Sequence, residues 1–177
     1  MGVTPVEVCK RRLREIEAYL RRHDLSYRIL SKGDGEEWNR RSSWEKRGLT
    51  RCKNIFLRNH KGNRHFLVII DYYETLDIVR LENYFDRGKL SFASARRLDR
   101  YLGLAPGDVS LFGLLNDGHR HVEVFLDEAL RDKELTFLPN CRGTYIALPF
   151  DEVRSFLAAT GHAMELFPLT SGNGDKA

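Results

Sequence analysis

The first residues of this chain that could do chemistry are a lysine and an asparagine in a predicted β-hairpin. Residues 51–70 contain two apolar runs joined by a polar turn with a Gly-Asn pair, and these two residue types tolerate the positive φ of hairpin turns. Side chains alternate along a strand, so Lys53 shares a face with Ile55 and Leu57, whereas Asn54 lies on the opposite face. A cation at the mouth of an apolar strand face can bind a phosphate or a carboxylate. The alternative is a lysine that only begins a strand in solvent.

A second candidate is the glycine-rich stretch at residues 103–113, GLAPGDVSLFG. Glycine permits backbone angles and close approaches that other residues cannot adopt, so this composition predicts a shaped loop. Such a loop can direct backbone N–H groups at a carbonyl or phosphate oxygen. An ordinary connection between two elements is the alternative.

Metal and triad chemistry have little support in the sequence. His60 and His65 are separated by a turn, and His119 and His121 lie on one predicted strand face, which is not convincing ligand spacing. No serine or cysteine is distinguished from its neighbours as a nucleophile with a base beside it. We therefore expect no metal and no cofactor.

Amphipathic helices must position these residues, and the first of them is strongly basic. Thr4 can cap a helix that begins at Pro5, with Glu7 in its first turn. Apolar residues follow at helical spacing, and the opposite face is either solvated or a contact for a nucleic-acid backbone. The candidate nucleic-acid-binding residues are Lys10, Arg11 and Arg14 on this helix, with Arg47, Arg51 and Arg64 further along the chain.

The remaining pattern alternates strands with helices. It predicts helices at residues 36–48, 76–85, 95–102 and 150–159, and strands at 26–30, 89–94, 122–126 and 145–148, with one more strand following residues 130–137 through a turn. Interleaving of this kind indicates an α/β fold with helices packed on a mixed sheet. Periodicity alone leaves the topology open.

Length and composition favour one cytoplasmic domain. Residues 1–170 are expected to form it, and residues 171–177 a disordered polar tail. The net charge of +4 permits a polyanionic partner without demanding one. Three cysteines without a CxxC pair or an export signal suggest thiols in a reducing compartment. No apolar run approaches the roughly 18 residues of a membrane span, so we expect no membrane partner.

Three segments carry a resemblance to a known family. They are KNIFLR at residues 53–58, KLSFASARRLDRYLGLAPGDVSLFGLLN at 89–116 and FLPNCRGT at 137–144. In this order they resemble the YbaK/ProX family, which contains free-standing aminoacyl-tRNA deacylases related to the editing domain of bacterial prolyl-tRNA synthetases. The resemblance spans roughly residues 25–160. It implies a strongly curved mixed sheet, or barrel, surrounded by helices.

The resemblance also implies a reaction and roles for residues. The expected reaction is metal-independent hydrolysis of the ester joining a wrong amino acid to a tRNA, most directly alanine or another small amino acid on proline tRNA. Lys53 would hold the nucleotide end and Asn54 would help position the substrate, and the ribose hydroxyl of the substrate would assist attack. The implied substrate-binding residues are Gly107, Ser110, Leu111, Phe112, Gly113, Leu138 and Asn140. Aminoacylated tRNA is the expected partner, with prolyl-tRNA synthetase or an elongation factor as further candidates.

Two departures from the family pattern concern the expected pocket. Leu111 stands where the family usually has proline, and Leu138 where it usually has histidine. A histidine-proline and threonine segment that the family usually carries near residues 36–48 is also not found. Because the lysine, both asparagines and the loop glycines remain, we favour an active enzyme with altered selectivity. The alternatives are a non-catalytic module that binds tRNA or a synthetase, and a purely protein-binding domain.

Overall fold

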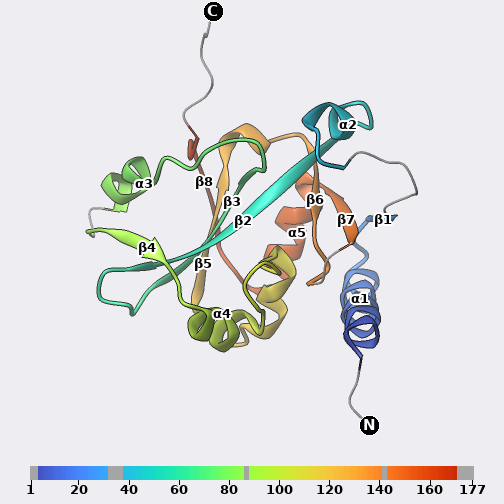
Figure 1. Ribbon diagram of the computed structural model, residues 1–177, viewed down its shortest axis with the longest axis horizontal. Coiled ribbons are helices and arrows are strands. Elements are labelled where there is room, and N and C mark those ends of the chain that lie inside the picture. Colours follow the sequence, from blue (N-terminus) through green and yellow to red (C-terminus); the bar gives the residue numbers. More distant parts are fainter. Residues whose placement is uncertain (1–3, 32–37, 86–87, 141–142, 171–177) are drawn as a thin grey trace, which may run out of the picture.

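The computed structural model describes residues 4–31, 38–85, 88–140 and 143–170. In these ranges one mixed sheet of eight strands runs in the order β1-β7-β6-β2-β3-β5-β8, and β4 also pairs with β2 (Figure 1). The strands are β1 Arg28–Ser31, β2 Leu49–Asn59, β3 His65–Asp71, β4 Leu90–Phe92, β5 Val122–Asp127, β6 Glu134–Phe137, β7 Thr144–Pro149 and β8 Met164–Phe167. The expected mixed α/β fold and the hairpin formed by β2 and β3 are thereby confirmed.

Apart from α2, the helices begin and end near the positions that the sequence predicts. They are α1 Pro5–Arg22, α2 Arg41–Glu45, α3 Ile78–Phe85, α4 Ala95–Leu102 and α5 Phe150–Thr160, with 3₁₀ turns at Leu111–Asn116 and Glu128–Leu130. The Thr4 hydroxyl accepts from the Glu7 N–H at 3.3 Å, and the Glu7 carboxylate accepts from the Thr4 N–H at 2.7 Å. This reciprocal cap satisfies two N–H groups that the first turn of a helix leaves without partners.

The central strand β2 is paired continuously along only one of its edges. Antiparallel β3 pairs with it from Cys52 to Arg58. On the other edge, parallel β6 pairs with residues up to Arg51, and antiparallel β4 pairs only from Leu57 onward. On this second edge, the stretch of β2 between the two partners has no strand beside it in the described ranges. Figure 1 shows β2 crossing the molecule with β4 near one end and β6 near the other.

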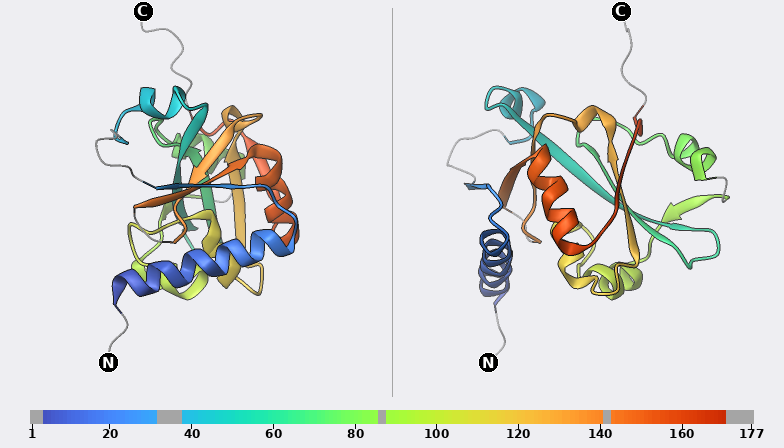
Figure 2. Two further views of the ribbon diagram at one scale, coloured as in Figure 1. Left: turned by 90° about the vertical axis from the view of Figure 1, so that its right-hand side faces the viewer. Right: turned by 180° about the vertical axis from the view of Figure 1, so that it is seen from behind.

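Apolar side chains pack on both faces of this sheet. The main cluster includes Ile16 of α1, Leu102 of α4 and Phe156 of α5, all buried. A second cluster joins Leu57 of β2 to Leu81 of α3 and to neighbours on β3 and β5. Figure 2 shows α5 lying across one face of the sheet. Burial on both faces fixes the strand register, because a one-residue slip would turn the apolar set outward.

Three expectations need correction. The helix expected at residues 36–48 is reduced to α2 in the described part, because Trp38 and Trp44 pack against Tyr145 of β7. Strand β8 was not predicted. The expected tail at 171–177 lies outside the described residues and stays a prediction. Cys52 is a buried free thiol as expected, whereas Cys9 forms a disulfide.

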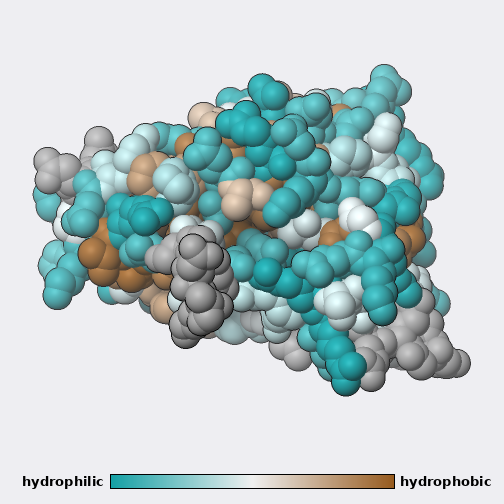
Figure 3. Space-filling view, turned by 90° about the horizontal axis from the view of Figure 1, so that it is seen from above, coloured by the Kyte–Doolittle hydropathy of each residue, from teal (hydrophilic) through white to brown (hydrophobic). Residues whose placement is uncertain are grey.

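None of the helices in the described ranges is both long and apolar enough to cross a membrane. In Figure 3, hydrophilic side chains cover most of the visible face, with apolar side chains between them.

Candidate active site

A pocket of about 450 Å³ lies at the stretch of β2 that has no strand beside its second edge. It brings together strand β2, the turn after β3, the glycine-rich loop and the segment around β7. The lining residues are Arg51, Cys52, Lys53, Asn54, Tyr72, Gly107, Val109, Leu138, Gly143 and Tyr145. Four of the residues predicted from the sequence for catalysis or substrate binding therefore meet here, namely Lys53, Asn54, Gly107 and Leu138.

Lys53 is half-buried and directed toward the turn that follows β3. Its Nζ donates a hydrogen bond to the Glu74 carbonyl oxygen at 2.8 Å and lies 6.0 Å from the centroid of the Tyr72 ring. An ammonium group carries three N–H donors, so one bond leaves donors for a second acceptor. The carbonyl thus orients the cation without neutralising its charge.

The two predicted asparagines each hold a buried amide oxygen without a partner in the described part of the chain. These atoms are Asn54 Oδ1 and Asn140 Oδ1. Asn54 is a lining residue of the pocket, whereas Asn140, two positions after Leu138, is not among the lining residues. Buried polar side-chain atoms are nearly always hydrogen-bonded, so unpaired ones beside a pocket indicate where a ligand can donate. Asn140 also has a left-handed backbone with φ 58°. Arg12 of α1 supports it by donating from Nη1 to the Asn140 carbonyl oxygen at 2.6 Å.

One side of the pocket combines a guanidinium group with tyrosine rings. Arg51 Cζ lies 3.6 Å from the centroid of the Tyr72 ring and 5.9 Å from that of Tyr145. Tyr145 is stacked on Trp38 at 5.5 Å. We did not identify Tyr72 or Tyr145 from the sequence. The register of the hairpin could have identified Tyr72, because it pairs this residue with Arg51. In the structure the Tyr72 N–H donates to the Arg51 carbonyl at 2.8 Å.

The loop after α4 divides between the pocket and the core. Gly107 and Val109 line the pocket, whereas Ser110 is fully buried. The Ser110 hydroxyl donates to the Leu138 carbonyl oxygen and accepts from the Phe112 N–H at 3.4 Å. Ser110 therefore holds Leu138 in the pocket wall.

The structure does not bring the next three predicted residues to the pocket lining. Leu111 and Phe112 are fully buried in the main cluster, where the Phe112 ring packs edge-on against that of Phe156. A Cβ on Gly113 would lie 2.7 Å from a methyl carbon of Leu104, so glycine is needed there for close packing. Leu111, Phe112 and Gly113 therefore pack in the core behind the residues that line the pocket.

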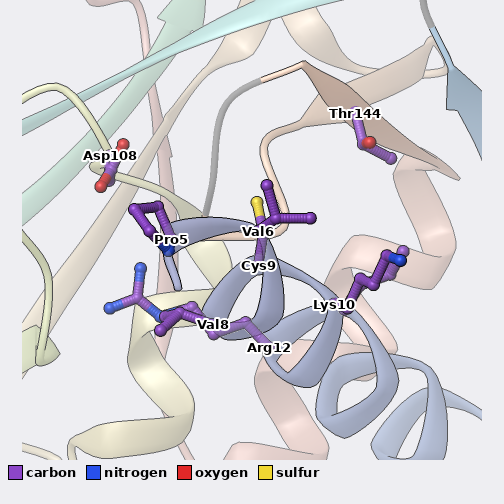
Figure 4. A pocket seen from close by; sticks show the side chains of 9 residues that line it. Pro5, Val6, Val8, Cys9, Lys10, Arg12, Asp108 and Thr144 are labelled. Carbon is purple, nitrogen blue, oxygen red and sulfur yellow. The ribbon is translucent and has the colours of Figure 1, made fainter. Parts of the chain in front are cut away.

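The predicted basic residues are spread along the molecule. Lys10 lines a second pocket of about 610 Å³ between α1, Asp108 and Thr144, shown in Figure 4. Arg11 and Arg14 are exposed on the same helix, and Arg11 is 3.8 Å from Glu15. These residues share the α1 side of the molecule.

The other three basic residues lie elsewhere. Arg51 is inside the first pocket, and Arg47 lies over the ring of Trp38 at 5.1 Å. Arg64 sits at the hairpin turn, where its Nε donates to Glu123 at 2.6 Å. Arg64 is therefore at the opposite end of β2 from the pocket.

The fold and the pocket together define a class of protein, an α/β domain with a small polar pocket beside the open edge of its central strand. A model of the aminoacyl-tRNA editing domain matches residues 42–156. The chain belongs to this family. The prolyl-tRNA editing protein ProX of Acetoanaerobium sticklandii is 36% identical over 118 residues, which cover 66% of this chain and 72% of that protein. The expected family membership is confirmed.

Solved structures agree on the fold. A structure described as a candidate trans-editing enzyme for prolyl-tRNA synthetase matches with a TM-score of 0.65 at 18% identity, covering 97% of this chain and 100% of the other. A structure from a study of epitope grafting onto scaffold proteins matches with a TM-score of 0.66 at 15% identity, covering 96% and 99%. At these identities the likeness concerns the fold alone.

Proposed function

We propose that this protein is a trans-editing deacylase that hydrolyses the ester between a wrong amino acid and the terminal adenosine of a tRNA. Family membership supports the reaction, and the name of the ProX relative supports proline tRNA as the substrate. Alanine or another small amino acid is the cargo that the resemblance in sequence implies. One observation carries the proposal for this chain. Lys53, Asn54, Gly107 and Leu138 line one pocket beside the open stretch of β2, and this supports the proposal.

The lining of the pocket limits how the reaction can proceed. Among the described residues that line it there is no carboxylate and no histidine, so no general base of the usual kind is at hand. Cys52 is not a nucleophile, because burial raises the pKa of its thiol far above the usual range. Attack on the ester therefore depends on groups that the substrate brings, and its own ribose hydroxyl fits that role.

The lining also suggests roles for the remaining groups. The ammonium group of Lys53 is available to the nucleotide end of the substrate. Val109 and Leu138 supply apolar walls of fixed size, since Ser110 holds the Leu138 carbonyl. The active site of a synthetase cannot exclude amino acids that are smaller than its cognate amino acid. A second pocket that admits only small side chains corrects the resulting errors.

The basic residues Lys10, Arg11 and Arg14 of α1 are proposed to bind the tRNA backbone. This helix is linked to the segment after Leu138 by the bond from Arg12 to the Asn140 carbonyl. Contacts with the tRNA backbone release counterions, so tRNA binding should weaken as salt increases. A role of prolyl-tRNA synthetase or an elongation factor as protein partner stays a prediction, as does a cytoplasmic location.

The deciding experiment measures deacylation of proline tRNA charged with alanine, serine, threonine, 2-aminobutyrate or proline. We expect loss of one small amino acid while proline is spared. Lys53→Ala should lower the rate by about 100-fold or more, because it removes the cation that positions the substrate. Lys61→Ala is the matched control, since Lys61 is exposed in the hairpin turn.

Two results would contradict the proposal. Equal rates for wild type and Lys53→Ala would remove Lys53 from the mechanism. Binding of tRNA without hydrolysis of any ester would instead identify a non-catalytic module, with Leu138 as the altered residue in the pocket wall.

A further inference from the structure

The main-chain groups of Asn54 point away from β3. In an antiparallel pair, every second residue exchanges hydrogen bonds with the partner strand, and the residues between direct their N–H and C=O to the other edge. The Tyr72 N–H donates to the Arg51 carbonyl at 2.8 Å, and the Asn59 N–H donates to the Arg64 carbonyl at 3.1 Å. Residues 51, 53, 55, 57 and 59 therefore bond to β3, which leaves Asn54 facing the opposite edge.

That edge is open at Asn54. Pairing with β6 ends at Arg51, and the β4 side begins where the Ala93 N–H donates to the Phe56 carbonyl at 3.0 Å. In the part of the chain that the structure describes, neither the register of β6 nor that of β4 reaches Asn54, and no main-chain hydrogen bond outside the strand pairings involves it. Asn54 is one of the residues that line the pocket. Main-chain N–H and C=O groups are normally paired in a folded protein, so an unpaired donor and acceptor on a lining residue can be completed by a ligand.

We propose that Asn54 binds the aminoacyl group of the substrate through its main chain, as though the amino acid were one residue of an added strand. The Asn54 N–H donates to the ester carbonyl oxygen, and the Asn54 carbonyl accepts from the α-ammonium group. This inference rests on the proposed function and names a group that performs it.

The chemistry of the aminoacyl group fits this arrangement. Its amine and carbonyl are attached to the same carbon, as in a strand residue, so it offers one donor and one acceptor to an opposite residue. Addition of a strand to an open sheet edge is a common way to bind peptide-like groups. The main-chain atoms are shared by all amino acids, so selection is left to the apolar walls at Val109 and Leu138.

The same N–H would act during hydrolysis. When water adds to the ester carbon, the carbonyl electron pair moves onto its oxygen, and the Asn54 N–H stabilises that developing negative charge. Collapse of the intermediate re-forms the carbonyl and expels the ribose oxygen, which takes up a proton that originated on the water. Asn54 thus contributes through its backbone in addition to its side chain.

The test compares Asn54→Pro with Asn54→Ala. Both variants lack the amide side chain, but only proline lacks the backbone N–H. Proline is tolerated on a strand where its nitrogen faces an open edge, and the preceding Lys53 is already in a strand, as proline requires. We expect Asn54→Pro to lose about 100-fold in kcat relative to Asn54→Ala, the cost of one oxyanion donor. Equal kcat values in the two variants would overturn the inference.

A second measurement uses unaltered protein, in case Asn54→Pro does not fold. Propionyl-tRNA has the carbonyl of alanyl-tRNA but no amine. Its kcat/KM is first corrected for its slower spontaneous hydrolysis. The corrected value should be lower than that of alanyl-tRNA by a factor of about ten or more, because the bond from the ammonium group to the Asn54 carbonyl is missing. A corrected kcat/KM equal to that of alanyl-tRNA would overturn the inference.

A binding readout separates this inference from the proposed function. A nonhydrolysable amide analogue of alanyl-adenosine should bind Asn54→Ala more tightly than Asn54→Pro, whether or not the protein hydrolyses esters. Failure of wild type to deacylate would therefore count against the proposed function alone. Equal affinity of the two variants for the analogue would count against main-chain recognition alone.

Discussion

Asn54 and Asn59 are the same residue type on the same strand, one at the pocket and the other at the hairpin turn. The Asn59 side chain donates to Asn63 Oδ1 at 2.8 Å, and its oxygen accepts from the N–H groups of Asn63 and Arg64, each at 3.1 Å. Asn54 has a buried amide oxygen with no partner among the described residues. A satisfied buried amide fixes the shape of a turn, whereas an unsatisfied one beside a pocket marks a place for ligand.

The hairpin end also holds a cluster that resembles a catalytic site in residue type. His65 Nδ1 lies 2.8 Å from His121 Nε2, and Arg97 Nη1 lies 2.9 Å from His65 Nε2. The rings of Phe56 and Tyr101 flank His65, which is fully buried. The side chains of this cluster hydrogen-bond to one another. At the pocket end, the amide oxygen of Asn54 has no partner among the described residues. Residue type alone therefore does not identify the site.

The largest expected effect comes from Asn59→Ala. This change removes the acceptor of two N–H groups in the turn and should lower the free energy of unfolding by about 3 kcal/mol. Urea denaturation measures the loss, and the deacylation rate of the folded variant should equal that of wild type. A variant that is as stable as wild type but inactive would reverse the proposed roles of the two ends.

The histidine cluster should make stability depend on pH. Burial, followed by the nearby His121 and Arg97, lowers the pKa of His65 from 6.5 to about 4. As the pH falls, the unfolded chain takes up this proton first, so stability declines between pH 6.5 and about 4. The slope from this group is at most about 1.4 kcal/mol per pH unit.

Denaturation curves across this pH range check the expectation for His65. His65→Gln is the control, because it removes the titrating group, and its profile should be flatter than that of wild type. Identical profiles for the two proteins would show that the hairpin end does not depend on a neutral His65.

Asn54→Ala should lower activity and leave stability nearly unchanged, whereas Asn59→Ala should lower stability and leave activity unchanged. We expect about a tenfold loss in kcat/KM, equivalent to about 1.4 kcal/mol. The free energy of unfolding should change by less than about 0.5 kcal/mol, because no protein partner of the amide oxygen is lost. A large loss of stability would mean that Asn54 is structural like Asn59.

Arg12→Ala should have the smallest effect. It removes the bond from α1 to the Asn140 carbonyl and should lower the free energy of unfolding by about 1 kcal/mol. Arg22→Ala on the exposed end of the same helix is the control. Equal stability of the two variants would show that α1 does not support the pocket through Asn140.

Local elements are where prediction from sequence succeeded. The predicted Thr4 cap is confirmed. The Ser94 hydroxyl that accepts from the Arg97 N–H at 3.4 Å, and the left-handed Gly103 and Gly161 that end α4 and α5, follow equally local rules. Each depends on residues within a few positions of one another, so spacing along the chain is sufficient evidence. The helix expected at 36–48 was wrong in length because its tryptophans pack against Tyr145, far away in sequence.

The sequence by itself determined the hairpin, the capped helices, and the adjacency of Lys53 and Asn54 on opposite faces of one strand. Only the tertiary structure decided that β6 and β4 leave the edge of β2 open between them, and that Leu111, Phe112 and Gly113 pack behind the pocket. It also decided that Arg12 supports Asn140, a contact between residues 128 positions apart. Alternation and helical spacing specify which way a side chain faces within its own element, but they carry no information about which distant segments pair or stop pairing.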